Sequence, residues 1–549
     1  MKASDLFVKS LEAEGVERIY GVPGEENADF MQSLAHSSID FILTRHEQGA
    51  AFMASVYGRL TGKVGVCLGT LGPGATNLIT GVADGNMDRA PVLVITGQGA
   101  LTRQHKESHQ VMNVVEMYRP VTKWTCSVNH PDNIPEIVHK AIKLAVAEKP
   151  GACHIELAED VAAMQTDAAI LRPSRARRPV PDERTIDEVW DKLKSAKSPL
   201  IIAGNGAIRT RASKELRALC AATGIGALMT FMAKGALDLD DPRCLFTVGM
   251  GQRDFPQLAI DQSDLVLTIG YDPVEYGPAK WNANCHADII HMDFDPAESD
   301  LHYQPVIEVV GDLAHGLAAL NDRIRRDGAP DYDLAVQRKL RSTMIEEFER
   351  YADDDTEGAI RPQKAIADVR AVLGPDDILL SGVGAHKMWV ARHYQSHAPN
   401  RCLISNGFCS MGMPLPGAIA AKHAVPSSKV LAIVGDGDIM MNVQEMETAS
   451  RLGADITVLV WEDKAYGLIA WKQEQDFGTH TDLSFNNPDW PQLCAAMGWH
   501  HQSCTASSDL QSALRAALDH QGPAMVVIPI DYRENMELTR RLGKIDETF

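Results

Sequence analysis

The chain lacks long runs of apolar residues, has few aromatic side chains and contains no closely spaced pair of cysteines. None of its apolar stretches approaches the roughly 20 residues that a membrane-spanning helix needs, so no membrane association is expected. The sequence passes directly from Met1 into an amphipathic helical pattern without the apolar region of a signal peptide. Its ten cysteines show neither a C-x-x-C pair nor the spacing of a zinc site. We therefore expect reduced cysteines and a cytoplasmic protein.

Positive charge is also scarce, with 53 Lys and Arg residues against 73 Asp and Glu residues and a net charge of −20. Such an excess of negative charge argues against nucleic acid as a partner, because phosphates would be repelled. It keeps a large oligomer soluble. Hydrophobic residues make up 45% of the chain but aromatic residues only 6%, which is typical of the aliphatic core of layered α/β proteins.

Short apolar runs alternate with helical patterns along the whole chain, which predicts α/β architecture with parallel sheets covered by helices on both faces. Two polar stretches interrupt the alternation, the first at 172–184 and the second from 327–333 through an acidic helix that ends at 351–357. We therefore predict three doubly wound parallel-sheet domains, at residues 1–165, 185–325 and 360–549. The runs expected as strands are Val92–Thr96, Ala152–Leu157, Leu200–Ala203, Leu265–Ile269, Ile289–Met292, Ile378–Leu380, Leu431–Val434, Ile456–Trp461 and Met525–Ile530.

Acidic residues follow two consecutive apolar runs near the C-terminal end. The run Val430–Val434 stops at Gly435-Asp436-Gly437, and the run Ile456–Trp461 stops at Glu462-Asp463. A right-handed crossover sets parallel neighbours side by side, and ligands bind at the carboxyl ends of such strands. Two carboxylates meeting there would suit Mg²⁺, with phosphate oxygens as further ligands. The alternative is a plain turn in which Asp436 caps the next helix.

A second acidic residue of interest, Glu47, lies near the N-terminus in the sequence Arg45-His46-Glu47. An apolar run ending at Leu43 delivers this glutamate to the start of an Ala-rich helix. One interpretation of this carboxyl group is a functional residue of a binding or catalytic site. The alternative is an ordinary carboxylate that stabilises the helix N-terminus.

Together these motifs resemble those of thiamine diphosphate enzymes, in which Gly-Asp-Gly is followed by Asn-Asn and the activating glutamate lies in an Arg-His-Glu context. This chain departs from the pattern with Glu462-Asp463 in place of Asn-Asn. The resemblance implies a thiamine diphosphate-binding fold with pyrimidine-binding, central and diphosphate-binding domains in chain order. It implies that Asp436, Asp463 and the carbonyl of Ala465 bind Mg²⁺. It also implies that Glu47 hydrogen-bonds the aminopyrimidine ring of the cofactor and serves as the general acid/base, because desolvation in a water-poor pocket would raise the pKa of such a carboxyl group.

Further segments extend the resemblance over essentially the whole chain, including a small-residue loop at 69–77 and Ser405–Gly412. By resemblance, Met411 bends the cofactor, Cys409 offers its backbone carbonyl to the aminopyrimidine, and Leu468 and Ile469 also wall the substrate pocket. The full set of residues implied to bind the cofactor is Glu47, Pro23, Gly72, Asn77, Gly384, Ala385, His386, Cys409, Met411, Gly435, Asp436, Gly437, Asp463, Ala465, Tyr466, Gly467, Leu468 and Ile469.

Among these enzymes the chain is most similar to acetolactate synthases. His109-Gln110 takes the place of an active-site pair of that family, and both residues are expected to orient the acceptor substrate; the alternative is a solvent-exposed loop pair. The resemblance implies decarboxylation of pyruvate and carboligation to a second 2-keto acid, giving 2-acetolactate. Another thiamine diphosphate enzyme, such as a 2-keto acid decarboxylase, a pyruvate oxidase or another carboligase, and a silent regulatory paralogue are the alternatives.

The family resemblance also implies a homodimer or homotetramer with active sites between subunits, and it leaves room for a separate regulatory subunit. The segment Gly204-Asn205-Gly206 follows an apolar run, as in dinucleotide-binding folds, but position 209 is Arg where a third glycine would stand. A tight turn in a scaffold domain is the other interpretation. The segment Gly270–Tyr276 is similar to catabolic, FAD-independent acetolactate synthases, whereas Met441–Glu445 is similar to the biosynthetic branch. FAD is therefore not favoured as a cofactor.

Overall fold

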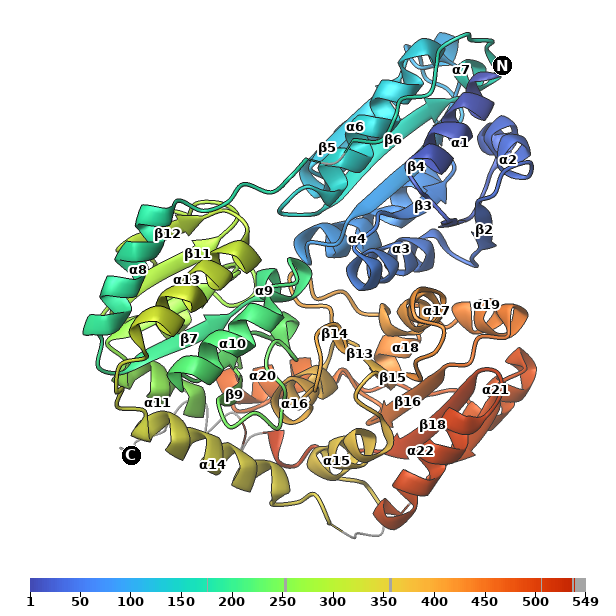
Figure 1. Ribbon diagram of the computed structural model, residues 1–549. Coiled ribbons are helices and arrows are strands. Elements are labelled where there is room, and N and C mark those ends of the chain that lie inside the picture. Colours follow the sequence, from blue (N-terminus) through green and yellow to red (C-terminus); the bar gives the residue numbers. More distant parts are fainter. Residues whose placement is uncertain (175, 251–253, 355–357, 505, 536–537, 539–549) are drawn as a thin grey trace.

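The computed structural model describes residues 1–174, 176–250, 254–354, 358–504, 506–535 and 538. Its described part holds three six-stranded sheets in which all paired strands are parallel, so the predicted α/β fold with three parallel-sheet layers is confirmed (Figure 1). We name the parts built on these sheets the N-terminal, central and C-terminal units. The end of the third predicted domain lies outside the described residues.

The N-terminal unit contains β1 (Arg18–Gly21), β2 (Asp40–Leu43), β3 (Gly65–Gly69), β4 (Val92–Gln98), β5 (Trp124–Val128) and β6 (Ala152–Ala158), with helices α1 (Ala3–Ala13), α2 (Ala28–Leu34), α3 (Glu47–Thr61), α4 (Pro73–Met87), α5 (Val114–Tyr118), α6 (Ile134–Val146) and α7 (Glu159–Ala163). The central unit contains β7 (Pro199–Ala203), β8 (Ala227–Met229), β9 (Cys244–Thr247), β10 (Leu265–Ile269), β11 (Asp288–Asp293) and β12 (Ile307–Val310), with α8 (Glu183–Ser195), α9 (Asn205–Arg209), α10 (Ser213–Thr223), α11 (Phe255–Gln262), α12 (Pro278–Trp281) and α13 (Leu313–Asp327).

Helix α14 (Ala335–Glu349) leads to the C-terminal unit, which contains β13 (Ile378–Ser381), β14 (Cys402–Ile404), β15 (Val430–Gly435), β16 (Thr457–Glu462), β17 (His500–Ser503) and β18 (Ala524–Pro529). Its helices are α15 (Pro362–Val372), α16 (Ala385–His393), α17 (Pro414–Ala424), α18 (Asp436–Ile439), α19 (Glu445–Leu452), α20 (Gly467–Phe477), α21 (Trp490–Met497) and α22 (Leu510–Asp519).

The N-terminal and C-terminal sheets share one strand order, β2-β1-β3-β4-β6-β5 and β14-β13-β15-β16-β18-β17. In each, the chain turns to one side of its first strand and then to the other, so the strand order reverses between β1 and β3 and between β13 and β15. Crevices that receive ligands open at the carboxyl ends of strands at such reversal points. The loops after these four strands are therefore the places to look for a site.

All nine apolar runs expected as strands lie in strands of the structure to within one residue at their ends, because aliphatic residues on both faces suit a sheet buried by helices on both sides. The apolar run before Glu47 likewise ends in β2, whereas eight further strands of the described residues were not predicted. Several of these strands are short, and β8 and β14, with three residues each, are too short to show a strand pattern of their own in the sequence. Gly435-Asp436-Gly437, expected as a turn, instead leads into the short helix α18, which begins at Asp436.

The N-terminal and C-terminal units pack on each other through α3 and α17, which lie side by side in Figure 1. A Cβ at Gly417 of α17 would lie 3.0 Å from Val56 of α3, so a glycine is needed for the two helices to approach this closely. Buried side chains of both units, including Met53 and Leu415, form one hydrophobic cluster. The relative position of the two units is thus fixed by a shared core. Among the described helices, none is long and apolar enough to cross a membrane.

Candidate active site

Asp436 and Asp463 lie at the carboxyl ends of the neighbouring strands β15 and β16, where the sequence predicts them to meet. Gly435 pairs with Trp461 in the parallel ladder. Asp436 Oδ2 accepts hydrogen bonds from the backbone N–H groups of Asp463 at 3.2 Å and Lys464 at 2.7 Å. The strand register therefore brings the two predicted metal-binding carboxylates together.

The electrostatics of this pair fit a divalent cation. Burial and the neighbouring Asp436 carboxylate raise the pKa of Asp463 to about 7. A Cβ at Gly467 would lie 2.3 Å from Asp463 Oδ2, so the glycine keeps room beside this carboxylate. Carboxylate and carbonyl oxygens, with Ala465 two residues along the chain, are the ligand types that Mg²⁺ prefers. A cation here would offset the repulsion between the carboxylates.

Asn487 supports the same carboxylate, and sequence reasoning missed it. Its Nδ2 donates hydrogen bonds to Asp436 Oδ2 and to Glu462 Oε1, both at 2.8 Å. Its Oδ1 is buried and has no hydrogen-bond partner among the described residues. Groups of this kind orient metal-binding carboxylates from behind. Because Asn487 belongs to no local motif, only its contacts identify it.

The reversal point between β13 and β15 forms a cradle of bare backbone around His386. Cβ atoms at Gly384 and Gly435 would lie 2.8 Å and 3.1 Å from the imidazole ring. His386 Nε2 and Asp438 Oδ2 are buried, lie 3.7 Å apart and have no hydrogen-bond partner in the part of the chain that the structure describes. Glycine backbone, an imidazole and the N-terminus of α16, which starts at Ala385, suit the phosphate groups of the predicted cofactor.

Glu47 is the first residue of α3, as predicted, and is buried. Asn77 Nδ2 of α4 donates a hydrogen bond to Glu47 Oε2 at 2.9 Å. A Cβ at Gly74 would lie 3.4 Å from Glu47 Oε1, so glycine leaves space in front of that oxygen. The structure therefore brings the predicted residues Glu47 and Asn77 together. Asn77 holds Oε2 of the Glu47 carboxylate, and Oε1 faces the backbone of Gly74.

Gln110 packs against the predicted loop residue Gly72. Gly72 has φ +52°, and a Cβ there would lie 3.0 Å from the carbonyl oxygen of Gln110. Gln110 itself has φ +58°. The side chains of Gln110 and His109 are exposed, and no hydrogen bond that we describe joins the His109 side chain to another predicted site residue. Pro23, two residues after β1, is half-buried at the reversal point of the N-terminal sheet.

The loop that carries Cys409 is held by buried charges from two directions. Asp84 Oδ1 of α4 accepts hydrogen bonds from Ser405 Oγ at 2.5 Å and from the backbone N–H of Ser410 at 3.3 Å. Lys387 Nζ donates to the carbonyl of Ser405 at 2.8 Å and to Cys409 Sγ at 3.1 Å. Cys409 is exposed and has φ +58°. Its backbone is thus presented in a fixed orientation.

The remaining predicted residues border the Asp436–Asp463 site. Tyr466 packs its ring against Phe485, with the ring centroids 5.2 Å apart, and a Cβ at Gly437 would lie 3.0 Å from the Tyr466 ring. Ile469 is 49% exposed, while Leu468 and Met411 are half-buried. These side chains offer apolar surface next to the carboxylates.

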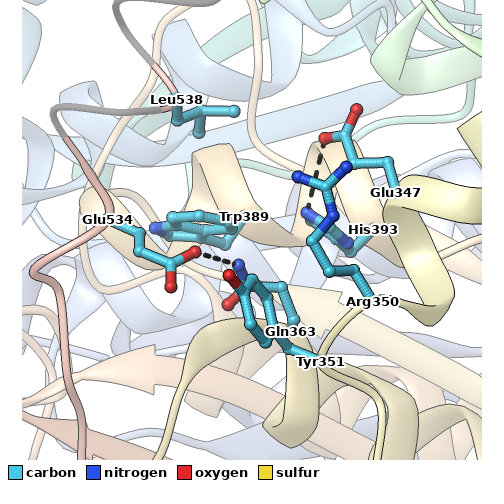
Figure 2. Close-up of a pocket in the computed structure, with 8 residues that line it drawn as sticks. All are labelled: Glu347, Arg350, Tyr351, Gln363, Trp389, His393, Glu534 and Leu538. Atoms are coloured by element: carbon cyan, nitrogen blue, oxygen red, sulfur yellow. Dashed lines mark hydrogen bonds and ion pairs between the residues drawn. The ribbon is translucent and has the colours of Figure 1, made fainter.

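A separate pocket lies between α14, α15, α16 and the segment around Glu534 (Figure 2). Its lining includes Trp389 and the hydrogen-bonded pair Gln363 and Glu534, but none of the predicted site residues. Its volume of about 10 Å³ holds roughly one water molecule. It is therefore too small for a substrate.

Comparison with known proteins agrees with this geometry. Three thiamine pyrophosphate enzyme models match, the N-terminal binding domain at residues 1–117, the central domain at 186–320 and the C-terminal binding domain at 382–528. The catabolic acetolactate synthase of Raoultella terrigena is 34% identical over 542 residues, covering 98% of this chain and 97% of the relative. The chain belongs to the acetolactate synthase family of thiamine pyrophosphate enzymes. The resemblance drawn from the motifs is confirmed.

Other members of the acetolactate synthase family match over a similar extent. The acetolactate synthase of Bacillus subtilis (strain 168) is 32% identical over 544 residues, covering 98% of this chain and 94% of the relative. The acetolactate synthase isozyme 2 large subunit of Escherichia coli (strain K12) is 31% identical over 540 residues, covering 98% and 97%. The N-terminal and C-terminal family models cover the stretches that carry Glu47 and Asp436.

Proposed function

We propose that the protein is a thiamine diphosphate- and Mg²⁺-dependent acetolactate synthase, which decarboxylates pyruvate and joins the remaining two-carbon unit to a second 2-keto acid, giving 2-acetolactate. The observation that carries the proposal is that a chain similar to acetolactate synthases over almost its full length brings together both polar pairs of the site. These are Glu47 with Asn77 and Asp436 with Asp463.

When bound, thiamine diphosphate supplies a carbon nucleophile for the keto group and accepts the electron pair released with carbon dioxide. The side chains of Asp436 and Asp463 and the carbonyl of Ala465 would hold Mg²⁺. The glycine-lined cradle at Gly384, His386 and Gly435 would hold the diphosphate. These assignments rest on the oxygen ligands, on the repulsion between two carboxylates that a cation would offset, and on the bare backbone described above.

Glu47 acts as the general acid/base in this proposal. Its Oε2 is held by Asn77, so its Oε1, beside Gly74, is the oxygen that can carry a proton toward the pyrimidine ring. A carboxyl oxygen with open space in front of it can pass a proton to a ligand group placed there. Cys409 would present its backbone carbonyl to the same ring, and Met411 would support the bent cofactor.

Gln110 and His109 orient the acceptor 2-keto acid, and Leu468 and Ile469 line its apolar side. His109, Gln110 and Ile469 are exposed, and Leu468 is half-buried. This exposure fits a surface that is covered only when substrate and a second subunit are present. Gln110 stays in place through its contact with Gly72. Polar side chains of this kind stabilise the charge that develops on the acceptor oxygen.

The active unit is a homodimer or homotetramer in the cytoplasm, with each site completed by two chains. Two segments next to the carboxylates expose large apolar side chains, at Met440, Met441, Ile469 and Phe477, the last 77% exposed. Large apolar side chains exposed near a site support an interaction surface there. The large-subunit name of the Escherichia coli relative leaves room for a regulatory subunit.

The central unit serves as a scaffold without FAD in this proposal. Cβ atoms at Gly204 and Gly206 would lie 2.4 Å and 2.5 Å from backbone atoms of Gly270. The Gly-Asn-Gly turn therefore packs directly on the loop after β10, across the crevice that a dinucleotide would enter. A colourless purified protein supports this point, and a flavin spectrum contradicts it.

Product analysis tests the function. The purified protein is incubated with pyruvate, thiamine diphosphate and Mg²⁺, and we expect 2-acetolactate, detected as acetoin after acid treatment. Acetaldehyde as the sole product would instead indicate a decarboxylase, and peroxide formation an oxidase. No release of carbon dioxide would indicate a silent paralogue.

A further inference from the structure

Glu445, the first residue of α19, makes contacts that the sequence did not predict. Its side chain is fully buried. Its carboxylate accepts hydrogen bonds from the backbone N–H of His46 at 3.0 Å and from that of Arg45 at 3.2 Å and 3.3 Å. These two N–H groups directly precede Glu47. A carboxylate of the C-terminal unit thus holds the backbone that delivers the predicted general acid/base.

A second contact from the same helix reinforces the first. Arg451 Nη2 of α19 donates a hydrogen bond to the carbonyl of Leu43 at 2.5 Å. The Glu445 carboxylate is itself fixed by Thr448 Oγ1, which donates to Oε2 at 2.6 Å. Helix α19 therefore holds both N–H and carbonyl groups of the connection between β2 and α3, on either side of Thr44.

The sequence of α3 is adapted to this approach. A Cβ at Gly49 would lie 2.7 Å from Glu445 Oε1, closer than side-chain atoms approach, so only glycine lets the carboxylate reach its position. N–H groups around a helix start have no partner within the helix and are usually satisfied by a nearby side chain or by water. Burying a carboxylate for this purpose is costly unless it is fully hydrogen-bonded, as it is here.

We propose that Glu445 is a positioning residue for Glu47, fixing through the N–H groups of Arg45 and His46 the helix start from which the Glu47 carboxylate projects. The proposal rests on the role of Glu47 as general acid/base. Helix α19 follows α18, which begins at Asp436, and both belong to the C-terminal unit. The position of Glu47 is therefore tied to the C-terminal unit of its own chain. A small displacement of a catalytic group lowers turnover steeply, whereas substrate binding elsewhere in the site stays intact.

Four variants separate positioning from folding. Glu445→Ala removes the carboxylate, and Glu445→Gln keeps one oxygen that can accept the His46 N–H. Gly49→Ala displaces the carboxylate by its new Cβ while favouring the helix by about 1 kcal/mol, so loss of folding is not expected. Glu12→Gln is the matched control, since Glu12 of α1 also accepts a backbone N–H, that of Ser38, but at the exposed surface.

In the enzyme loaded with thiamine diphosphate and Mg²⁺, we expect Glu445→Ala and Gly49→Ala to lower kcat about 10- to 100-fold while KM for pyruvate changes less than about threefold. Glu445→Gln gives an intermediate kcat, and Glu12→Gln stays within about twofold of wild type. Hydrogen exchange at the amides of Arg45 and His46 becomes faster in Glu445→Ala and Gly49→Ala, whereas the cofactor content of both variants is unchanged.

Three results would overturn the proposal in different ways. Wild-type kcat in both Glu445→Ala and Gly49→Ala, together with the expected loss in Glu47→Gln, would refute the positioning role alone. Full turnover by Glu47→Gln would refute the role of Glu47 and the proposal with it. Unchanged exchange at Arg45 and His46 in Glu445→Ala would show that the carboxylate does not hold these groups.

Discussion

Asp463 stands where related enzymes carry asparagine, and replacing it with asparagine should stabilise the metal-free protein in a pH-dependent way. Burial and the Asp436 carboxylate raise the pKa of Asp463 from 3.8 to about 7. A rise of about three in pKa corresponds to at most about 4 kcal/mol. Because the folded state holds the proton more tightly, this stability is fully present below about pH 4 and is lost as the pH rises through about 7.

The side-chain amide introduced by Asp463→Asn does not titrate, so the variant keeps the stability that the wild type loses. We expect the difference in unfolding free energy, variant minus wild type, to grow between pH 4 and pH 7 and to level off above it. Urea unfolding in the presence of a chelator measures this difference. Saturating Mg²⁺ should stabilise the wild type more than the variant, because the cation relieves the repulsion between Asp436 and Asp463. A difference that is independent of pH would refute the reasoning.

Three further predictions concern other parts of the site and the fold. Burial raises the pKa of Glu275 to about 8, so the stability of the wild type relative to Glu275→Gln should fall as the pH rises from about 5 to 8 in thermal unfolding. Asn77→Ala removes the donor to the Glu47 carboxylate and should lower kcat at least about tenfold, whereas an unchanged kcat would contradict that contact's role. Gly467→Ala places a Cβ 2.3 Å from Asp463 Oδ2 and should weaken Mg²⁺ binding, measured by calorimetry.

The sequence predicted those features that local patterns control. Aliphatic runs bounded by glycine and acidic residues form β15 and β16, and the rule that neighbouring parallel strands end at one edge brought Asp436 to Asp463. The helix start at Glu47 follows from an apolar run meeting an Ala-rich segment. Short strands such as β8 and β14 escaped prediction, because their three residues owe their conformation to neighbouring strands.

The supporting residues of the site could not be predicted, because their roles lie in contacts between distant segments. Glu445 accepts hydrogen bonds from backbone N–H groups about 400 positions away, and no sequence motif around Glu445 predicts this contact. Asn487 reaches Asp436 from a loop that sequence reasoning left without a role. Asp84 holds the Cys409 loop from a helix of the N-terminal unit. Such contacts depend on how the units pack, which no single motif encodes.

The central claim is that Glu47 of one chain and Asp436 of another serve a single cofactor, and subunit complementation tests it most directly. Glu47→Gln and Asp436→Ala should each be nearly inactive alone. After mixing and subunit exchange, one site in each mixed dimer regains both wild-type residues, so about one quarter of the wild-type acetolactate synthesis should return. No recovery in verified mixed dimers, or substantial activity of either variant alone, would contradict the account.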